Sequence, residues 1–337
     1  MGKKQIIFLG LFLVVVITGS FFYWKAKWTS NVNKKNNSSV QKNNEISNSL
    51  EPAKDVYDVP VAVVVENYPD ARPQSGLDKA DVVYETVAEG GITRFLAVYK
   101  HNKAENIGPI RSARTYFAEV ANELGAIFAH VGGNSDVLEE LRGKKYQNLI
   151  NLDQFFWENN FQRITSRKMP HNVFSSTDKL YEFSKVQSKE LKQAGKLPIS
   201  AMFTGEAVAK KINIDFLLQD YLVEYNYNEQ LKTYERKLAG KPHVDAETKK
   251  TLSTQNVIVQ FVKTWPVKSD TPFSIGMDLE NGGKALVFAE GKVTEGTWKK
   301  TDRTRYYNVT GQEISLTEGN LWVELVPEDR KGFVVWQ

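Results

Sequence analysis

Four arginines in the first half of the sequence are the residues best suited to bind a ligand: Arg72, Arg94, Arg111 and Arg114. Each of them lies beside a predicted turn or at the end of a predicted helix or strand. A guanidinium group presents a planar set of N–H donors that matches the oxygens of a phosphate or a carboxylate. The four arginines therefore predict a site for an anionic group.

Arg111 and Arg114 stand at the start of segment 111–124, RSARTYFAEVANEL, in which apolar residues recur at helical spacing. Gly125 follows, at a position where helices commonly end. The first turn of a helix carries positive partial charge and disfavours cations, so a bound anion would account for two arginines there. The alternative is that each arginine forms a structural ion pair with a nearby acid.

Three acids lie among these arginines and are the candidates for catalysis: Asp81, Glu85 and Glu89. One of them, or Asp153, would act as general acid in a hydrolase or a lyase. Glu85 and Glu89 fall in a predicted strand, where four residues span about 13 Å. Paired glycosidase carboxylates lie roughly 5–9.5 Å apart, so these two are not predicted to act as a pair. Orienting the arginines is the alternative role, and the sequence leaves open whether the protein is an enzyme.

Two histidines extend the predicted ligand site. His130 ends a predicted strand just before two glycines, and His171 lies in an aromatic and basic stretch at 161–174. His243 and Asp245 form a further polar pair in the second half. The sequence has 4 His and 0 Cys without the spacing of a zinc site, and it lacks phosphate-loop, dinucleotide and serine-hydrolase motifs. We therefore predict no metal and no cofactor.

The first half of the chain alternates between strand and helix patterns. A hairpin is predicted where strands at 81–87 and 92–99 flank a Gly-Gly turn. The other predicted elements are strands at 61–65 and 126–131 and helices at 111–124 and 136–142. This alternation predicts an α/β domain over residues 56–195.

The second half of the chain is predicted to form a smaller, β-rich domain over residues 196–337. A helical pattern is confined to 205–218. Short apolar runs separated by glycine and polar turns predict strands at 222–227, 257–262, 285–288, 306–309 and 321–326.

The N-terminus has the composition of a membrane anchor. Residues 6–24 carry no charge, follow Lys3 and Lys4, and would span about 28 Å as a helix. We predict a single transmembrane helix within residues 1–30, a disordered tether over 31–55, and folded domains on the extracytoplasmic side of the cell membrane. A cleaved signal peptide is the alternative interpretation of the same segment.

The overall charge narrows the range of partners. The chain has 337 residues, with 44 Lys and Arg against 40 Asp and Glu and a net charge of +4. So small an excess provides no general attraction for polyanions. Together with the predicted extracytoplasmic location, it argues against nucleic acid as a partner.

Several strings occur in order along both halves of the chain. They are ARPQSGLDKADVVYE, EGGITRFLAVY, GPIRSAR and HVGG in the first half, and YERKLAGKPHVD, QNVIVQFV and EGTWKK in the second. These strings resemble the YerB-like lipoprotein family, envelope proteins of Gram-positive bacteria with domains of unknown function, over about residues 56–335. Ser20 departs from the family, which usually has a lipidated cysteine at that place. The resemblance implies two domains, a location outside the cytoplasm and a cell-wall setting, but no reaction and no catalytic residue.

Together these inferences predict a membrane-anchored envelope protein that binds an anionic ligand or partner through an Arg-rich pocket. The expected partners are a cell-wall polymer or another envelope protein, with the membrane reached through residues 6–24. The alternative is a hydrolase or lyase that acts on peptidoglycan or another envelope polymer with a Glu or Asp as general acid.

Overall fold

The computed structural model describes residues 55–143, 145–187 and 189–337, which belong to one compact unit. The predicted transmembrane segment at 6–24 and, apart from its last residue, the predicted tether lie outside the described residues. Within the described ranges, no helix is long and apolar enough to cross a membrane. The structure thus concerns the part of the chain that carries the predicted ligand site.

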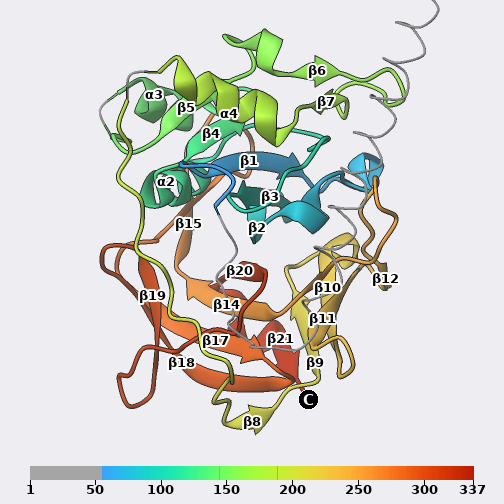
Figure 1. Ribbon diagram of the computed structural model, residues 1–337, viewed down its shortest axis with the longest axis vertical. Helices are drawn as coiled ribbons and strands as arrows, with labels where there is room; N and C mark the ends of the chain where they lie inside the picture. Colours follow the sequence, from blue (N-terminus) through green and yellow to red (C-terminus); the bar gives the residue numbers. More distant parts are fainter. Residues whose placement is uncertain (1–54, 144, 188) are drawn as a thin grey trace, which may run out of the picture. The chain divides into compact units, whose positions relative to one another are not determined.

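A long mixed sheet runs through both halves of the chain (Figure 1). Its strands follow the order β19-β18-β17-β14-β20-β2-β3-β1-β4-β5, with β8 beside β18. The first half supplies β1 (Val61–Glu66), β2 (Val82–Glu89), β3 (Ile92–Tyr99), β4 (Ile127–His130) and β5 (Ile150–Asp153). The second half supplies β8 (Ala207–Val208), β14 (Asn256–Val262), β17 (Gly283–Ala289), β18 (Lys292–Lys300), β19 (Thr304–Asn308) and β20 (Leu321–Pro327). The predicted hairpin is present as the antiparallel pair β2 and β3.

Strand β20 joins the two halves of this sheet. It runs parallel to both neighbours, β14 on one edge and β2 on the other, and it places Glu324 opposite Glu85. Every residue of β20 is buried, as expected for a strand that is paired on both edges and covered on both faces. The two halves that the sequence suggests therefore share one continuous sheet.

Both faces of the long sheet are covered. On one face, Ala62 and Val64 of β1 belong to the apolar core shared with α2 (Thr115–Leu124) and α3 (Ser135–Arg142). On the other face, Val63 belongs to the core shared with α4 (Thr177–Lys185) and with a second sheet. Successive side chains of a strand point to opposite faces, which explains why the whole run VAVVVE is buried.

The second sheet has the order β12-β11-β10-β9-β21, with β13 paired to β11. Its strands are β9 (Lys211–Asp215), β10 (Leu222–Asn228), β11 (Thr233–Leu238), β12 (Lys241–Pro242), β13 (Ser253–Thr254) and β21 (Val334–Trp336). Two short strand pairs complete the fold, β6 (Gln162–Arg163) with β7 (Val173–Phe174) and β15 (Thr264–Pro266) with β16 (Ile275–Met277). All strands predicted in the second half correspond to strands of the structure, namely β10, β14, β17, β19 and β20.

Two predicted helices differ from the structure. The helical interpretation of 205–218 is wrong, because this segment contains β8 and β9. In β9, Ile212 and Ile214 are buried while their neighbours are partly exposed, a period of two that suits pairing with β10 and β21. The helix predicted at 111–124 begins only at Thr115. The residues before it pair their backbone elsewhere, since the N–H of Arg111 donates to the carbonyl of Val64.

Candidate anion-binding pocket

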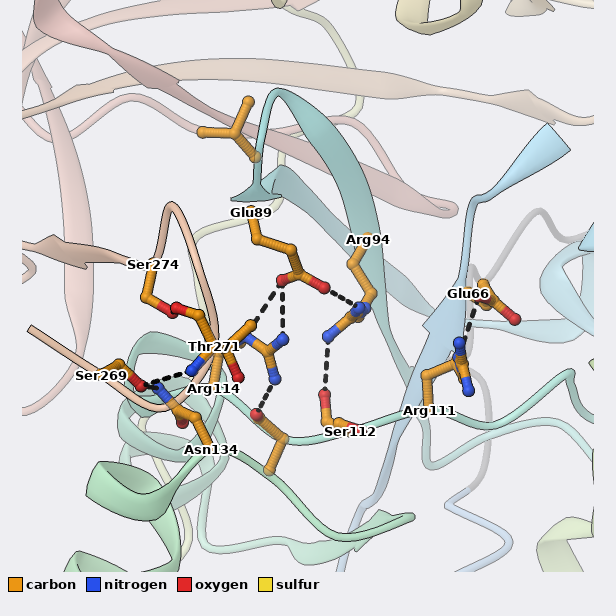
Figure 2. Close-up of polar contacts among 12 residues, drawn as sticks. Glu66, Glu89, Arg94, Arg111, Ser112, Arg114, Asn134, Ser269, Thr271 and Ser274 are labelled. Carbon is orange, nitrogen blue, oxygen red and sulfur yellow. Dashed lines mark hydrogen bonds and ion pairs between the residues drawn. The ribbon is translucent and has the colours of Figure 1, made fainter. Parts of the chain in front are cut away.

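Two of the candidate arginines share one carboxylate, Glu89 (Figure 2). Arg94 Nη2 lies 2.7 Å from Glu89 Oε1, and Arg114 Nη2 lies 2.7 Å from Glu89 Oε2. Their Nη1 atoms donate to the carbonyls of Ser112 and Ala113 at 3.0 and 2.6 Å. Burial raises the pKa of Glu89, but the two arginines more than offset this, so the pKa lies below its usual value. Both arginines are buried, and the cluster has the geometry of a structural ion-pair network.

The prediction that Arg111 and Arg114 occupy the first turn of a helix is wrong. Arg114 is the N-cap residue of α2, with an extended backbone at φ −136°. Arg111 lies further upstream, where its backbone pairs with Val64 and Val131. The positive end of the helix dipole therefore does not explain why these two residues are arginines.

Arg111 and His171 meet at a different carboxylate, Glu66, which ends β1. Arg111 Nε lies 2.9 Å from Glu66 Oε1 (Figure 2), and His171 Nδ1 lies 2.7 Å from Glu66 Oε2. The Arg111 contact is an ion pair without a directed N–H hydrogen bond. Glu66 is buried, whereas the side chain of Arg111 is 26% exposed. We refer to these three residues as the Glu66 group.

The outer edge of Arg111 remains available to a ligand. Neither Nη1 nor Nη2 of Arg111 has an acceptor among the residues that the structure describes. Both nitrogens of a guanidinium edge can bind one phosphate or carboxylate in parallel. Arg111 is therefore neutralised on its inner side by Glu66 and free to bind an anion on its outer side.

A pocket of about 340 Å³ lies beside Arg111. Its polar lining consists of Arg111, Ser112, Arg163 and the two glycines at 132 and 133. Its apolar lining consists of Ile110, Val131, Leu138, Phe155, Met169, Pro170 and Val173. No Asp or Glu is among the lining residues. The pocket thus combines two guanidinium groups with an apolar wall.

Further donors in this pocket have no acceptor within the described part of the chain. Arg163 donates to Asn172 Oδ1 at 3.1 Å and has no carboxylate partner there. The backbone N–H groups of Ser112 and Gly133 donate to no described residue, nor does the Ser112 hydroxyl. An oxyanion beside Arg111 would supply acceptors for such donors.

Gly132 shapes the floor of the pocket. Its φ is +57°, and a Cβ at this position would lie 2.8 Å from Cε2 of Phe155. The Gly132 N–H donates to Asp153 Oδ1 at 2.9 Å, and His130 Nδ1 lies 2.8 Å from the Gly132 carbonyl. His130 is fully buried, and burial lowers its pKa. His130 therefore supports the pocket backbone from below instead of facing a ligand.

Arg72 lies outside the pocket. Its Nε and Nη2 donate to the Asn67 carbonyl at 3.2 and 2.8 Å, and its guanidinium lies 5.0 Å from the centroid of the Tyr221 ring. Of the predicted ligand-binding residues, only Arg111 lines the pocket, with His171 behind it on Glu66.

The predicted catalytic acids also lie away from the pocket. Asp81 Oδ2 accepts from the backbone N–H groups of Lys100 and His101 at 2.6 and 3.0 Å. Glu85 is fully buried and is paired with Arg236. Within the described ranges, no group of three or more His, Asp or Glu residues is placed to hold a metal ion. The pocket therefore has no carboxyl group positioned as a general acid.

Glu85 belongs to a second, fully buried polar group between the two sheets. Arg236 Nη2 pairs with Glu85, Nη1 donates to Nδ1 of His243, and Nε donates to the Tyr225 hydroxyl at 3.2 Å. The guanidinium also lies 4.5 Å from the centroid of the Trp322 ring. Burial and the charge of Arg236 lower the pKa of His243, which keeps the ring neutral. We refer to Glu85, Arg236 and His243 as the Glu85 group.

Sequence reasoning missed Glu66, Arg163 and Arg236. Glu66 closes the apolar run VAVVVE, and a charge at the end of a buried strand is a usable signal for a site. Arg236 falls two residues from Tyr234 and from Leu238 in β11, so strand alternation places it on the buried face with them. Arg163 lies in the same aromatic and basic stretch as His171, and its own sequence context gives no comparable signal.

Comparison with known proteins shows which family the chain belongs to. The model described as "Protein of unknown function (DUF3048) N-terminal domain" matches residues 48–192, and its C-terminal counterpart matches residues 212–323. The Bacillus subtilis (strain 168) protein named "Putative lipoprotein YerB" is 35% identical over 280 residues, which cover 80% of this chain and 81% of that protein. The crystal structure of YerB from Bacillus subtilis matches with a TM-score of 0.72 and 34% identity, covering 81% of this chain and 92% of that chain. These matches confirm the YerB-like resemblance and the presence of two domains, and the chain belongs to the DUF3048 family.

Proposed function

We propose that this protein is an envelope-associated binding protein that holds an anionic group in the pocket beside Arg111. The anion would belong to a cell-wall polymer or to another component of the envelope. The lipoprotein name of the YerB relative and the predicted membrane segment at 6–24 support the location. The pocket itself supports the binding role.

The main observation that supports the proposal is that only the inner side of the Arg111 guanidinium has an acidic partner. Its inner Nε is 2.9 Å from the buried Glu66, while its outer nitrogens have no acceptor among the described residues. The ion pair fixes the guanidinium so that less side-chain entropy is lost when a ligand binds. Arg163 adds a second guanidinium without a carboxylate partner in the described ranges. The pocket therefore offers more positive than negative charge to a ligand.

The geometry supports binding more strongly than hydrolysis. A general acid must lie within hydrogen-bond reach of the substrate atom that it protonates. Asp81, Glu85 and Glu89 are all engaged elsewhere, and none lines the pocket. Asp153 is used to hold the backbone at Gly132. We therefore place the hydrolase or lyase hypothesis second.

A titration with soluble anions tests the proposed site directly. The probes are inorganic phosphate and acetate, added to the full-length protein while the arginine Nε–H signals are followed by NMR. We expect saturable shifts at Arg111, and a loss of affinity of about tenfold or more in Arg111→Ala, because charged hydrogen bonds contribute about 1.5–3 kcal/mol. Arg142→Ala is the matched control, since Arg142 is an exposed arginine at the end of α3 and does not line the pocket. Equal affinity in both variants would refute the site.

Purified Gram-positive cell walls provide the test of the wall-polymer partner and of the enzyme alternative. The full-length protein is mixed with walls, the pellet is analysed for bound protein, and the supernatant is analysed for released fragments by mass spectrometry. We expect binding without release, weakened by Arg111→Ala and unaffected by Arg142→Ala. Fragments that disappear in Glu89→Gln or Asp81→Asn would instead establish the hydrolase.

A further inference from the structure

The mouth of the pocket carries exposed apolar side chains. Phe155 is 70% exposed, Phe156 is 73% exposed and Met169 is 72% exposed. Phe155 and Met169 line the pocket together with Arg111, and Phe156 follows Phe155 in the chain. Large exposed apolar groups at the edge of a pocket are typical of a surface that binds another protein or a membrane. We refer to Phe155, Phe156 and Met169 as the mouth patch.

Hydrogen bonds to Asp153 fix the turn that contains Phe155 and Phe156. The Phe155 N–H donates to Asp153 Oδ1 at 3.1 Å, and the Phe156 N–H donates to the Asp153 carbonyl at 3.0 Å. The Phe155 ring lies against the bare backbone of Gly132, where a Cβ would clash with it. The next residue, Trp157, turns back to the protein and packs on Phe183 with ring centroids 4.8 Å apart. The exposure of Phe155 and Phe156 is thus imposed by ordered contacts around them.

Basic side chains border the mouth patch. Arg163 lines the pocket, and Lys168 precedes Met169; both are exposed and have no carboxylate partner in the described ranges. Segment 154–170 contains three basic residues and a single acid, Glu158. Aromatic and basic side chains in one exposed segment suit the boundary between the acyl chains and the headgroups of an anionic membrane.

The first described residues contact α4, the helix that also contacts Trp157 of this segment. The Tyr57 hydroxyl donates to Thr177 Oγ1 at 2.7 Å, and the Tyr57 ring lies 4.7 Å from that of Tyr181. Thr177, Tyr181 and the Phe183 that contacts Trp157 are all in α4, within about two helical turns of one another. The chain that leads from the predicted membrane segment therefore enters the folded unit on the same helix that supports the aromatic turn.

From these features we propose that the mouth patch docks on a membrane containing anionic phospholipid, so that a headgroup phosphate reaches Arg111 and Arg163. The inference rests on the proposed function and narrows the anion to a phosphate at the membrane surface. The patch supplies apolar contact with the acyl boundary, and the guanidinium groups donate hydrogen bonds to the phosphate oxygens. Tethering by the predicted span would raise the local concentration of the patch, so each contact can be weak.

Site-specific labelling tests the docking, because the sequence has no Cys and any introduced thiol is unique. A fluorophore is attached at Phe156→Cys in the full-length protein, which is reconstituted in vesicles with nitroxide-labelled lipid. The vesicles contain phosphatidylcholine alone or equal parts of phosphatidylcholine and phosphatidylglycerol. Leu231→Cys is the matched control, since Leu231 is also exposed but lies at the β10–β11 turn of the second sheet. We expect lipid quenching at residue 156, stronger with phosphatidylglycerol, and none at residue 231.

Arg111→Ala combined with the label at 156 tests the phosphate contact. We expect the docked fraction to fall about fivefold, the factor expected for one basic residue at an anionic surface. A label at 156 that stays accessible to aqueous iodide in both vesicle types would overturn the docking. Quenching that is insensitive to Arg111→Ala would overturn the phosphate contact and with it the inference as stated. If soluble phosphate still binds at Arg111 while docking fails, the proposed function survives; failure of the phosphate titration removes the proposed function itself.

Discussion

The Glu85 group and the Glu66 group each combine a glutamate, an arginine and a histidine, yet they differ in what the arginine does. Glu85 lies in β2 and Glu66 ends β1, and both strands flank β3. In the Glu85 group, Arg236 uses Nε, Nη1 and Nη2 on protein acceptors and has no exposed surface. In the Glu66 group, the side chain of Arg111 has Glu66 as its single partner among the described residues and is partly exposed.

If Arg111 binds an anion as proposed, residue type and pairing with a carboxylate do not distinguish a binding arginine from a structural one. The distinguishing property is whether the outer guanidinium nitrogens have acceptors within the protein. The outer guanidinium nitrogens of Arg94, Arg114 and Arg236 donate to acceptors within the protein, so these arginines are structural. The outer nitrogens of Arg111 have no acceptor among the described residues, and the pocket lies beside Arg111.

Removal of Arg236 is expected to have the largest effect on stability. Arg236→Met leaves the charge of Glu85 buried without a counter-ion, which typically costs about 3–5 kcal/mol. Urea unfolding followed by circular dichroism measures the loss. A double variant with Glu85→Met should recover much of it, because no unpaired charge remains. A midpoint for Arg236→Met equal to that of the wild type would show that Arg236 does not act as the structural counter-ion.

Replacement of Glu324, which pairs with Glu85 across β20 and β2, is expected to have a smaller effect on stability, and this effect depends on pH. Burial and the neighbouring charge of Glu85 raise the pKa of Glu324 well above its usual value. The stability from a raised carboxyl pKa is present below the unfolded value, about 4.3, and is lost as the pH rises toward the folded pKa. Glu324→Gln should therefore gain stability relative to the wild type as the pH is raised above about 4.3. Urea unfolding at a series of pH values checks this, and a difference that does not change with pH would contradict it.

Removal of Arg111 is expected to have the smallest effect on stability. Its partly exposed ion pair with Glu66 contributes about 0–1 kcal/mol, and His171 remains on Glu66 in Arg111→Ala. The melting temperature should therefore change little, although anion binding is lost. If Arg111→Ala were destabilised as strongly as Arg236→Met, the two groups would both be structural and the contrast between them would disappear.

Local patterns predicted several first-half elements but not β5 or α4. Strand β1, the hairpin of β2 and β3, and helix α3 beginning after Asn134 depend on residues that are near one another in sequence. The pairing of β20 with β2 joins residues more than 230 positions apart, as in Thr86 and Leu325, whose separation is 239. Periodicity reports which face of a strand is buried but carries no information on which distant strand lies beside it.

The anion site that the arginines indicate stays a prediction. Of the four candidate arginines, Arg111 lines the pocket, whereas Arg72, Arg94 and Arg114 do not. The separation of Arg94 and Arg114 from that pocket follows from their shared contact with Glu89 across the β2–β3 turn. The role of Glu66 depends on His171, 105 residues away, a contact that no spacing rule reveals.

The place of β20 near the end of the chain means that the long sheet is completed late. Until residues 321–327 are available for pairing, both β2 and β14 have an open edge where β20 will pair. By then the β2–β3 hairpin and helices α2 to α4 have already been made. Open strand edges invite pairing with other chains, so the newly made first half needs protection until the last long strand arrives. Truncation before Leu321 would consequently leave two unpaired edges in the long sheet, one in each half of the protein.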